Sequence, residues 1–191
     1  MMSNALSKIT AAILAVILVY LYPAVQSAHR QEDYRALAAY NTLVRFTDAV
    51  RNKGYVTQEM YNDFVYELAE SGSEYRIDLE HRHKKFHPEY GDAADSSTFL
   101  DRFSIHYEAH YSQEILSQLF PEPAVLPVGK RELESGAGPV YLMEVSDYFT
   151  VTITALSRTP YTIFNELLYG PASGSGPDAF TYGGMVLNED Y

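Results

Sequence analysis

The sequence contains no cysteine, which excludes disulfide bonds, thiol catalysis and zinc sites built from thiolates. It also contains no tryptophan, so its aromatic side chains are 17 Tyr and 9 Phe. Tyrosine suits half-buried strands and hydrated interfaces, because its ring is apolar and its hydroxyl is polar. The lack of cysteine does not fix the compartment, because exported proteins can lack it as well.

Positive charge is scarce. The 191 residues include 14 Lys+Arg against 25 Asp+Glu, which gives a formal net charge of −11. A surface this acidic repels phosphate backbones, so we expect no nucleic-acid partner. The composition is 47% hydrophobic and 20% charged, which is typical of a globular protein with a buried core.

Charge is missing altogether from residues 9–28, which lie between Lys8 and His29. Twenty helical residues at about 1.5 Å each span about 30 Å, the thickness of the hydrocarbon layer of a membrane. We therefore expect residues 1–28 to form a membrane anchor or signal segment. The apolar side chains expected to contact lipid or neighbouring subunits are Ile9, Ile13, Leu14, Ile17, Leu18 and Leu21.

Two fates of this segment stay open. A retained anchor is favoured by the helical pattern that continues after it. A cleaved secretory signal is the alternative, with Val25-Gln26-Ser27 as the cleavage site and Pro23 just before it. A buried helix of a soluble protein is the weakest reading, since such helices rarely run twenty residues without a charge.

The orientation of the anchor is argued from its flanks. Arg30, Arg35 and Arg45 follow the apolar segment, and the positive-inside rule alone would place the following domain in the cytosol. A tail of only eight residues before such a segment usually stays inside, however. We therefore expect a single-pass protein of the cell membrane whose C-terminal domain is extracytoplasmic.

The residues after the anchor predict two helices in succession. Apolar side chains recur at steps of three or four over residues 31–53, which indicates a helix. Gly54 follows at the position where a left-handed residue is favoured. Thr57 is a suitable N-cap for the second helix, which should end at Ser71 and Gly72.

The middle of the chain is harder to assign. Residues 75–80 alternate apolar and charged side chains, which indicates a half-buried strand, and residues 87–97 read as a loop. Residues 99–120 fit either a strand or a helix. At least residues 113–120 should be helical, with Ser112 as the N-cap.

The C-terminal part predicts a hairpin. Residues 121–139 form a connector rich in proline and glycine. Residues 140–145 and 148–155 read as two strands, and the intervening Ser146-Asp147 predicts a tight turn between them.

A short helix at 160–169, a flexible loop at 170–178 and an edge strand at 180–187 complete the expected elements. We therefore predict an α+β fold in which a long, pilin-like N-terminal transmembrane helix precedes a small antiparallel sheet packed on helices. The expected parts are the anchor at 1–28, an extracytoplasmic α+β domain at 29–170, and a flexible loop with a terminal edge strand at 171–191.

Two groups of histidines are the strongest candidates for metal ligands. They are His81, His83 and His87 in one group, and His106 and His110 in the other. A strand would place His81 and His83 on one face, where the second group could meet them. The neighbouring cations Arg82, Lys84 and Lys85 would repel a metal ion, so we expect no metal site and no other cofactor.

The sequence shows no catalytic motif. There is no GxSxG nucleophile elbow, no GxGxxG or Walker loop and no HExxH pair. We therefore expect no catalytic residues and no enzymatic activity. A metal-dependent hydrolase built on the histidines is the least favoured hypothesis.

Several segments resemble a known family. An apolar segment that runs into an amphipathic helix before a small α+β domain is the architecture of pilins and pseudopilins. The segment from Arg51 to Phe64 (RNKGYVTQEMYNDF), with Leu68 and Gly72, resembles small membrane-anchored, pilin-like proteins of Gram-positive bacteria, relatives of the TadE-type pseudopilins of tight-adherence pili. Residues 148–154 and 182–186 are similar to that group as well.

The resemblance implies a structural role without catalytic residues. Prepilins of this class usually carry a glutamate near the start of the apolar run, and Ser3 to Ile9 contain no acidic residue. A minor or accessory component of a surface filament or secretion apparatus is therefore implied, with membrane lipid and other subunits, including copies of itself, as partners.

The alternative is a membrane-tethered extracytoplasmic ligand-binding or sensor domain. Such a domain needs a pocket, for which the candidate lining residues are Tyr75, His81, His83, Tyr107 and His110.

Overall fold

The computed structural model describes residues 2–92, 95–121, 138–156 and 178–191, together with Ile163, Glu166 and Gly170. The first elements are α1 (Met2–Lys53), β1 (Tyr55–Thr57), α2 (Gln58–Glu70) and β2 (Tyr75–Tyr90). They are followed by the 3-10 helix η1 (Ser96–Thr98), β3 (Phe99–Tyr111) and α3 (Ser112–Leu119). The last are β4 (Val140–Leu142), β5 (Tyr148–Ala155) and β6 (Ala179–Met185).

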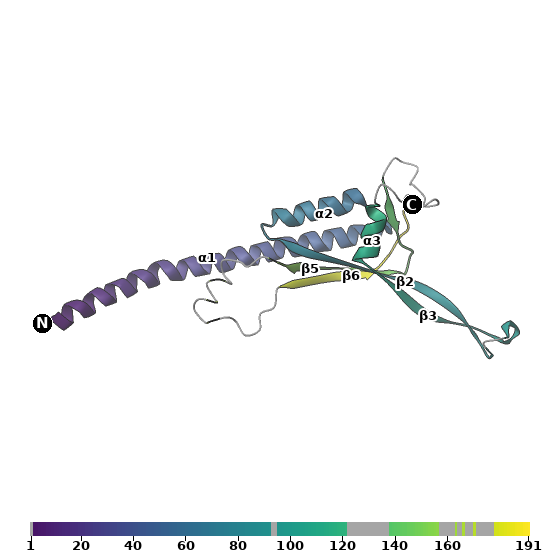
Figure 1. Ribbon diagram of the computed structural model, residues 1–191, viewed down its shortest axis with the longest axis horizontal. Coiled ribbons are helices and arrows are strands. Elements are labelled where there is room, and N and C mark those ends of the chain that lie inside the picture. The colour runs from purple at the N-terminus through teal and green to yellow at the C-terminus, as the bar shows by residue number, and fades with distance from the viewer. Residues whose placement is uncertain are drawn as a thin grey trace.

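The strands form two antiparallel sheets. The larger sheet has the order β3-β2-β5-β6, and the smaller one pairs β1 with β4. The C-terminal half of α1 packs on β5 and β6, and α2 lies along α1 on the side away from the sheet (Figure 1). This arrangement confirms the predicted α+β class with a long N-terminal helix and antiparallel sheets.

Helix α1 has two different halves. Its C-terminal half buries Ala39, Leu43, Phe46 and Val50, a stripe at the three- and four-residue spacing of one helix face. Its N-terminal half projects away from the rest of the molecule (Figure 1). Pro23 lies inside the helix without ending it.

The core lies between α1, α2, α3 and the sheet. The rings of Phe46 in α1 and Phe64 in α2 stack with their centroids 4.2 Å apart, and Phe46 also meets Phe149 of β5 edge-on. The remaining fully buried apolar side chains include Leu79, Ile115, Leu119, Met143, Val151, Ile153 and Val186. Buried and more exposed side chains alternate along β5 from Tyr148 to Ile153.

The ends of the first two helices follow the sequence rules. Gly54 has a φ of +77° directly after α1, where a side chain would be strained. The hydroxyl of Thr57 accepts a hydrogen bond of 3.1 Å from the Met60 N–H at the start of α2. The predicted end of the first helix and both predicted ends of the second are therefore confirmed, whereas the first helix is continuous with the apolar segment before it.

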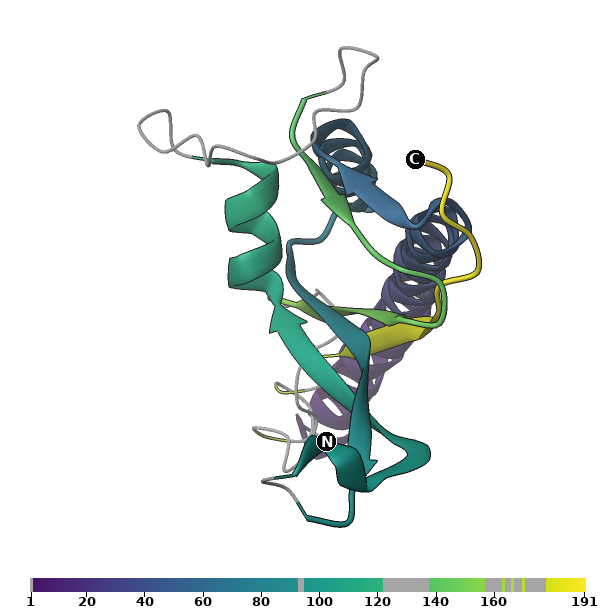
Figure 2. The same cartoon turned by 90° about the vertical axis from the view of Figure 1, so that its right-hand side faces the viewer.

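The β2–β3 ribbon is longer than predicted. Strand β2 continues to Tyr90, so the loop expected at 87–97 is wrong in its first part. Residues 99–111 are strand, which resolves the ambiguous segment, and the distal part of this ribbon extends beyond the rest of the sheet (Figures 1 and 2). The helix expected at 113–120 is present as α3.

Ser112 is not the N-cap that we expected. It is the first residue of α3, the preceding Tyr111 is the cap, and no side chain caps the helix there. The Ser112 hydroxyl instead lies 2.6 Å from the Leu79 backbone N–H and accepts its hydrogen bond. It therefore joins α3 to β2.

The predicted hairpin between residues 140–145 and 148–155 is wrong. Strand β4 pairs with β1, whereas β5 pairs with β2 and β6. The chain does turn at Ser146, which has a φ of +77°, but it passes from one sheet to the other. The final edge strand is confirmed as β6. The helix expected at 160–169 and the connector at 121–139 fall largely outside the described residues.

Candidate functional site

The N-terminal half of α1 exposes its apolar side chains. The relative exposure of Ile9, Ile13, Leu14, Ile17 and Leu18 lies between 47% and 64%. Leu21 is half-buried. Contiguous apolar surface of this kind is rare on soluble monomers and marks a site of contact with lipid or protein.

One helix among the described residues is long and apolar enough to span a membrane, and it is the part of α1 from Ser7 onward. None of its most apolar stretch is buried against the rest of the chain. The length and the composition of this helix therefore support the prediction of a membrane anchor.

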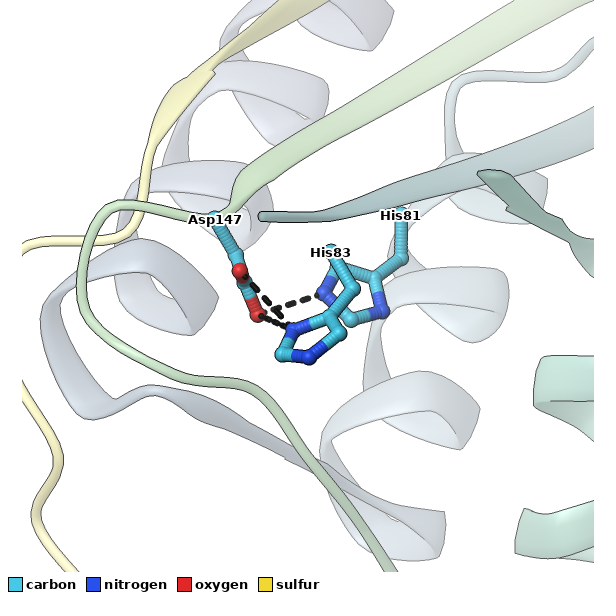
Figure 3. Close-up of side chains that lie close together, drawn as sticks. All are labelled: His81, His83 and Asp147. Carbon is cyan, nitrogen blue, oxygen red and sulfur yellow. Dashed lines mark hydrogen bonds and ion pairs between the residues drawn. The ribbon is translucent and has the colours of Figure 1, made fainter. Parts of the chain in front are cut away.

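A second cluster lies in the head, the part of the molecule from the C-terminal half of α1 onward. His81 and His83 project from the inward face of β2 and converge on Asp147, which lies between β4 and β5 (Figure 3). His81 Nε2 is 2.9 Å from Asp147 Oδ2. His83 Nδ1 is 3.1 Å from both carboxylate oxygens. The side chains of His81 and Asp147 are 5% and 1% exposed, and that of His83 is 26% exposed.

Backbone groups hold the carboxylate independently of the imidazoles. The N–H of Lys84 donates to Asp147 Oδ1 and the N–H of Glu144 donates to Oδ2, each over 2.9 Å. On the other side of the His81 ring, Nδ1 lies 2.7 Å from the hydroxyl of Tyr141. Asp147 and Tyr141, the two hydrogen-bond partners of the His81 ring, are both buried.

The electrostatics favour a carboxylate beside a neutral imidazole. Burial lowers the pKa of His81, although Asp147 opposes this shift. Burial alone would raise the pKa of Asp147, but the N–H donors of Lys84, Glu144 and the two histidines outweigh it and lower that pKa. Burial, with Glu114 and Asp147 nearby, raises the pKa of Tyr141.

The C-terminal segment fixes the position of Asp147. The N–H of Val186 donates to the Asp147 carbonyl over 2.7 Å, and the N–H of Ser146 donates to the Val186 carbonyl. The next residue, Leu187, donates its N–H to the carbonyl of Arg51 at the end of α1. The cluster is thus tied to the C-terminal end of α1 by the last residues of the chain.

The other histidines divide between this cluster and the surface. His110 lies opposite His81 in the β2–β3 ladder, and the two rings stack with centroids 5.7 Å apart. His110 Nδ1 contacts Glu114 at 2.7 Å. His106 instead meets His87 on the exposed part of the ribbon, with ring centroids 5.0 Å apart.

Of the five residues proposed to line a pocket, the structure brings together His81, His83 and His110. Tyr75 lies at the other end of the β2–β5 ladder, opposite Ala155, where it packs against the core. Tyr107 pairs with Lys84 in the ladder, so it lies on the opposite face of the sheet, where it meets Tyr148.

Asp147 and Tyr141 were missed at the sequence level. An aspartate after a serine between two strands reads as a turn former, and no local pattern links it to histidines more than sixty residues earlier. The placement of His81 and His83 on one face of a strand was the only feature of the sequence that pointed to this cluster.

The set of side chains can bind a cation or hold a hydrogen-bonded structure together. It offers two imidazole nitrogens and a carboxylate oxygen that all lie within 4.8 Å of one another. Comparison of the chain with profiles of protein families, with curated proteins and with solved structures finds no match. The functional argument therefore depends on this chain's own residues.

Proposed function

We propose that the chain is a membrane-anchored structural subunit, of the TadE-like pseudopilin type, in a surface filament or secretion apparatus. The observation that carries the proposal is the continuity of α1, which is one helix from Met2 to Lys53. Its first half offers apolar side chains to the surroundings, and its second half belongs to the core of the head.

The exposed half of α1 needs apolar surroundings, which water does not provide. Leu14 and Leu18 are 59% and 64% exposed, and Val16 and Val19 on other sides of the helix are 57% and 67% exposed. Removing such side chains from water contributes about 1.5–3 kcal/mol each. Lipid before assembly, and the same segment of neighbouring subunits afterwards, would each supply the apolar surroundings.

The packed half gives the helix a structural use beyond anchoring. Because α1 continues without a loop into the head, the position of each anchor segment sets the position of its head. Helices packed side by side would therefore arrange the heads in a regular array. This role requires no catalytic residues, and the extracytoplasmic location of the head forms part of the same proposal.

Charge substitutions in the exposed half test the membrane role. Ile13→Lys and Ile17→Lys should release the protein from the membrane fraction and abolish its assembly with other subunits, since a lysine at the centre of a membrane helix costs about 2.5–3.5 kcal/mol. Tyr66→Lys on the exposed surface of α2 is the matched control and should change neither property. Unchanged retention and assembly of the Ile13 and Ile17 variants would refute the proposal.

The absence of cysteine allows a sharper test of assembly. Ile17→Cys introduces a single thiol, and oxidation of intact membranes should produce disulfide-linked dimers. Tyr66→Cys should remain monomeric under the same conditions. Membrane retention without any crosslink through residue 17 would leave an anchor that does not assemble.

That outcome would favour the second candidate, a membrane-tethered binding domain. The cluster of His81, His83 and Asp147 is the observation that favours it, because His81 and Asp147 are buried polar groups beside the partly exposed His83, and such a cluster can hold a ligand. Protease treatment of intact cells that carry a C-terminal tag then reports the location of the head. Loss of the tag is expected for an extracytoplasmic head, and protection until lysis would contradict the proposed location.

A further inference from the structure

We propose that His81, His83 and Asp147 form a binding site for a divalent transition-metal ion, with zinc as the best match to the donor atoms. The donors are His81 Nε2, His83 Nδ1 and a carboxylate oxygen of Asp147. Two imidazoles and one carboxylate are a common set of three protein ligands for zinc, with a further position left for water.

The distances suit an ion after small movements. Zinc lies about 2.0–2.2 Å from such ligands, so the donors of a tetrahedral site are about 3.3 Å apart. In the structure Asp147 Oδ2 is 2.9 Å from His81 Nε2 and 3.1 Å from His83 Nδ1. Shifts of a few tenths of an ångström would bring these two distances to that value, and the two imidazole nitrogens, which lie within 4.8 Å of each other, would come together by small rotations of the rings as both bind the ion.

The surroundings already provide the second layer of contacts that metal sites use. When the metal takes Nε2 of His81, Nδ1 carries the proton and donates it to the hydroxyl oxygen of Tyr141, 2.7 Å away. The backbone N–H groups of Lys84 and Glu144 keep Asp147 oriented whether its other contacts are imidazoles or a metal ion.

The neighbouring cations do not oppose a metal ion as the sequence suggested. Arg82 and Lys84 alternate with the histidines along β2 and therefore project from its other face. There the Nε of Arg82 donates to Glu80, and the Nζ of Lys84 lies 4.9 Å from the centre of the Phe86 ring.

Lys85 shares the face of the histidines, but it forms an ion pair with Glu108, which lies opposite His83 in the ladder. The charge argument against a metal is thereby removed for each of the three cations.

The burial of the three ligands determines how an ion reaches the site and which parts of the fold a bound ion would join. The side chain of His83 is the most exposed of the three, at 26%, so an ion or a water ligand reaches the cluster beside it. A bound ion would join β2 to the segment between β4 and β5, and through Val186 to the end of the chain. The site therefore acts as a structural crosslink in a protein that has no disulfide bond.

The test uses the full chain in detergent, freed of metal with EDTA and then titrated with Zn²⁺ by calorimetry. One ion per chain should bind, and Zn²⁺ should raise the midpoint of thermal unfolding. Co²⁺ in place of Zn²⁺ should give the visible absorption bands of a site with nitrogen and oxygen ligands. Failure of the wild-type chain to bind either ion would leave a cluster that is hydrogen-bonded only, and the proposal would be wrong.

Three variants separate the site from the fold. His83→Ala should abolish the zinc-dependent rise in the unfolding midpoint, and Tyr141→Phe should weaken zinc binding by about tenfold or more. His87→Ala, on the same strand and face, should bind zinc as the wild type does. Equal zinc affinity in His83→Ala and the wild type would place the ion elsewhere and refute the assignment. Each result is independent of membrane retention, so it stands apart from the proposed structural function.

Discussion

His81 and Asp147 are 66 residues apart in the sequence, and their side chains meet at 2.9 Å in the interior of the head. Asp147 accepts from two histidines and two backbone N–H groups at once. A buried carboxylate with this many donors is stabilised in its charged form, and each donor would lose its acceptor if the carboxylate were removed. The pair therefore connects the middle of β2 to the start of β5 by a polar contact inside an apolar core.

Replacing this carboxylate should destabilise the fold. Asp147→Asn loses the charge and turns one accepting oxygen into a donor, so buried N–H groups are left without an acceptor. We expect a loss of about 2–4 kcal/mol in the free energy of unfolding, measured with urea in EDTA. Asp78→Asn is the control, because Asp78 is 58% exposed and faces Arg76 at 3.7 Å, and it should change stability by less than about 0.5 kcal/mol. Equal effects of the two substitutions would contradict the role assigned to Asp147.

The stability of the metal-free protein should fall in acid in two steps. His81 faces Asp147, His83, His110 and Tyr141, and burial lowers its pKa in the folded state. Its contribution is therefore fully present above the unfolded value of about 6.5 and is lost as the pH falls below it. The lowered pKa of Asp147 adds stability above about 3.9 that is lost at still lower pH.

Urea unfolding at a series of pH values in EDTA measures both steps. Asp147→Asn should remove the step at lower pH, because the amide does not titrate. A wild-type protein that becomes more stable as the pH is lowered from about 6.5 to 4.5 would contradict the direction of the pKa shift given for His81.

The glycine that ends α1 should tolerate no side chain. A Cβ at Gly54 would lie 2.3 Å from the carbonyl oxygen of Asn188, and its φ of +77° disfavours any L-residue. Gly72, after α2, has a φ of +78°, but its Cβ would only reach the Arg35 side chain at an ordinary 3.5 Å. Gly72→Ala should therefore cost about 1–2 kcal/mol from backbone strain alone.

Gly54→Ala should cost clearly more, because the last residues of the chain must also move. Thermal unfolding of both variants checks the difference. A Gly54→Ala variant as stable as Gly72→Ala would show that the C-terminal segment around Asn188 moves aside without any loss of stability.

The elements that depend on local pattern were predictable. The helical stripe of Leu43, Phe46 and Val50, the left-handed Gly54 and the cap at Thr57 are each specified by residues within a few positions of one another. The alternation of Val151 and Ile153 with threonines is likewise a local pattern typical of a half-buried strand, and residues 148–155 form β5. Periodicity and capping were sufficient for these parts.

The site was less predictable because it depends on pairing between distant strands. The register that places His110 opposite His81 is set over the whole length of β2 and β3, and a single sequence does not reveal it. Ser146 and Asp147 look the same whether the flanking strands pair with each other or enter different sheets. The carboxylate that completes the cluster was therefore read as a turn residue.

The single helix α1 also determines how far the cluster lies from lipid. With residues 9–28 in the hydrocarbon layer and the helix perpendicular to it, the 25 residues to Lys53 would carry the end of the helix about 38 Å beyond that layer. Asp147 is tied to that end through Val186 and Leu187, whereas the potential of charged headgroups decays over about 8 Å in physiological salt. The protonation of these histidines and their access to ions would then be governed by the surrounding aqueous compartment and would not change with the lipid composition of the membrane.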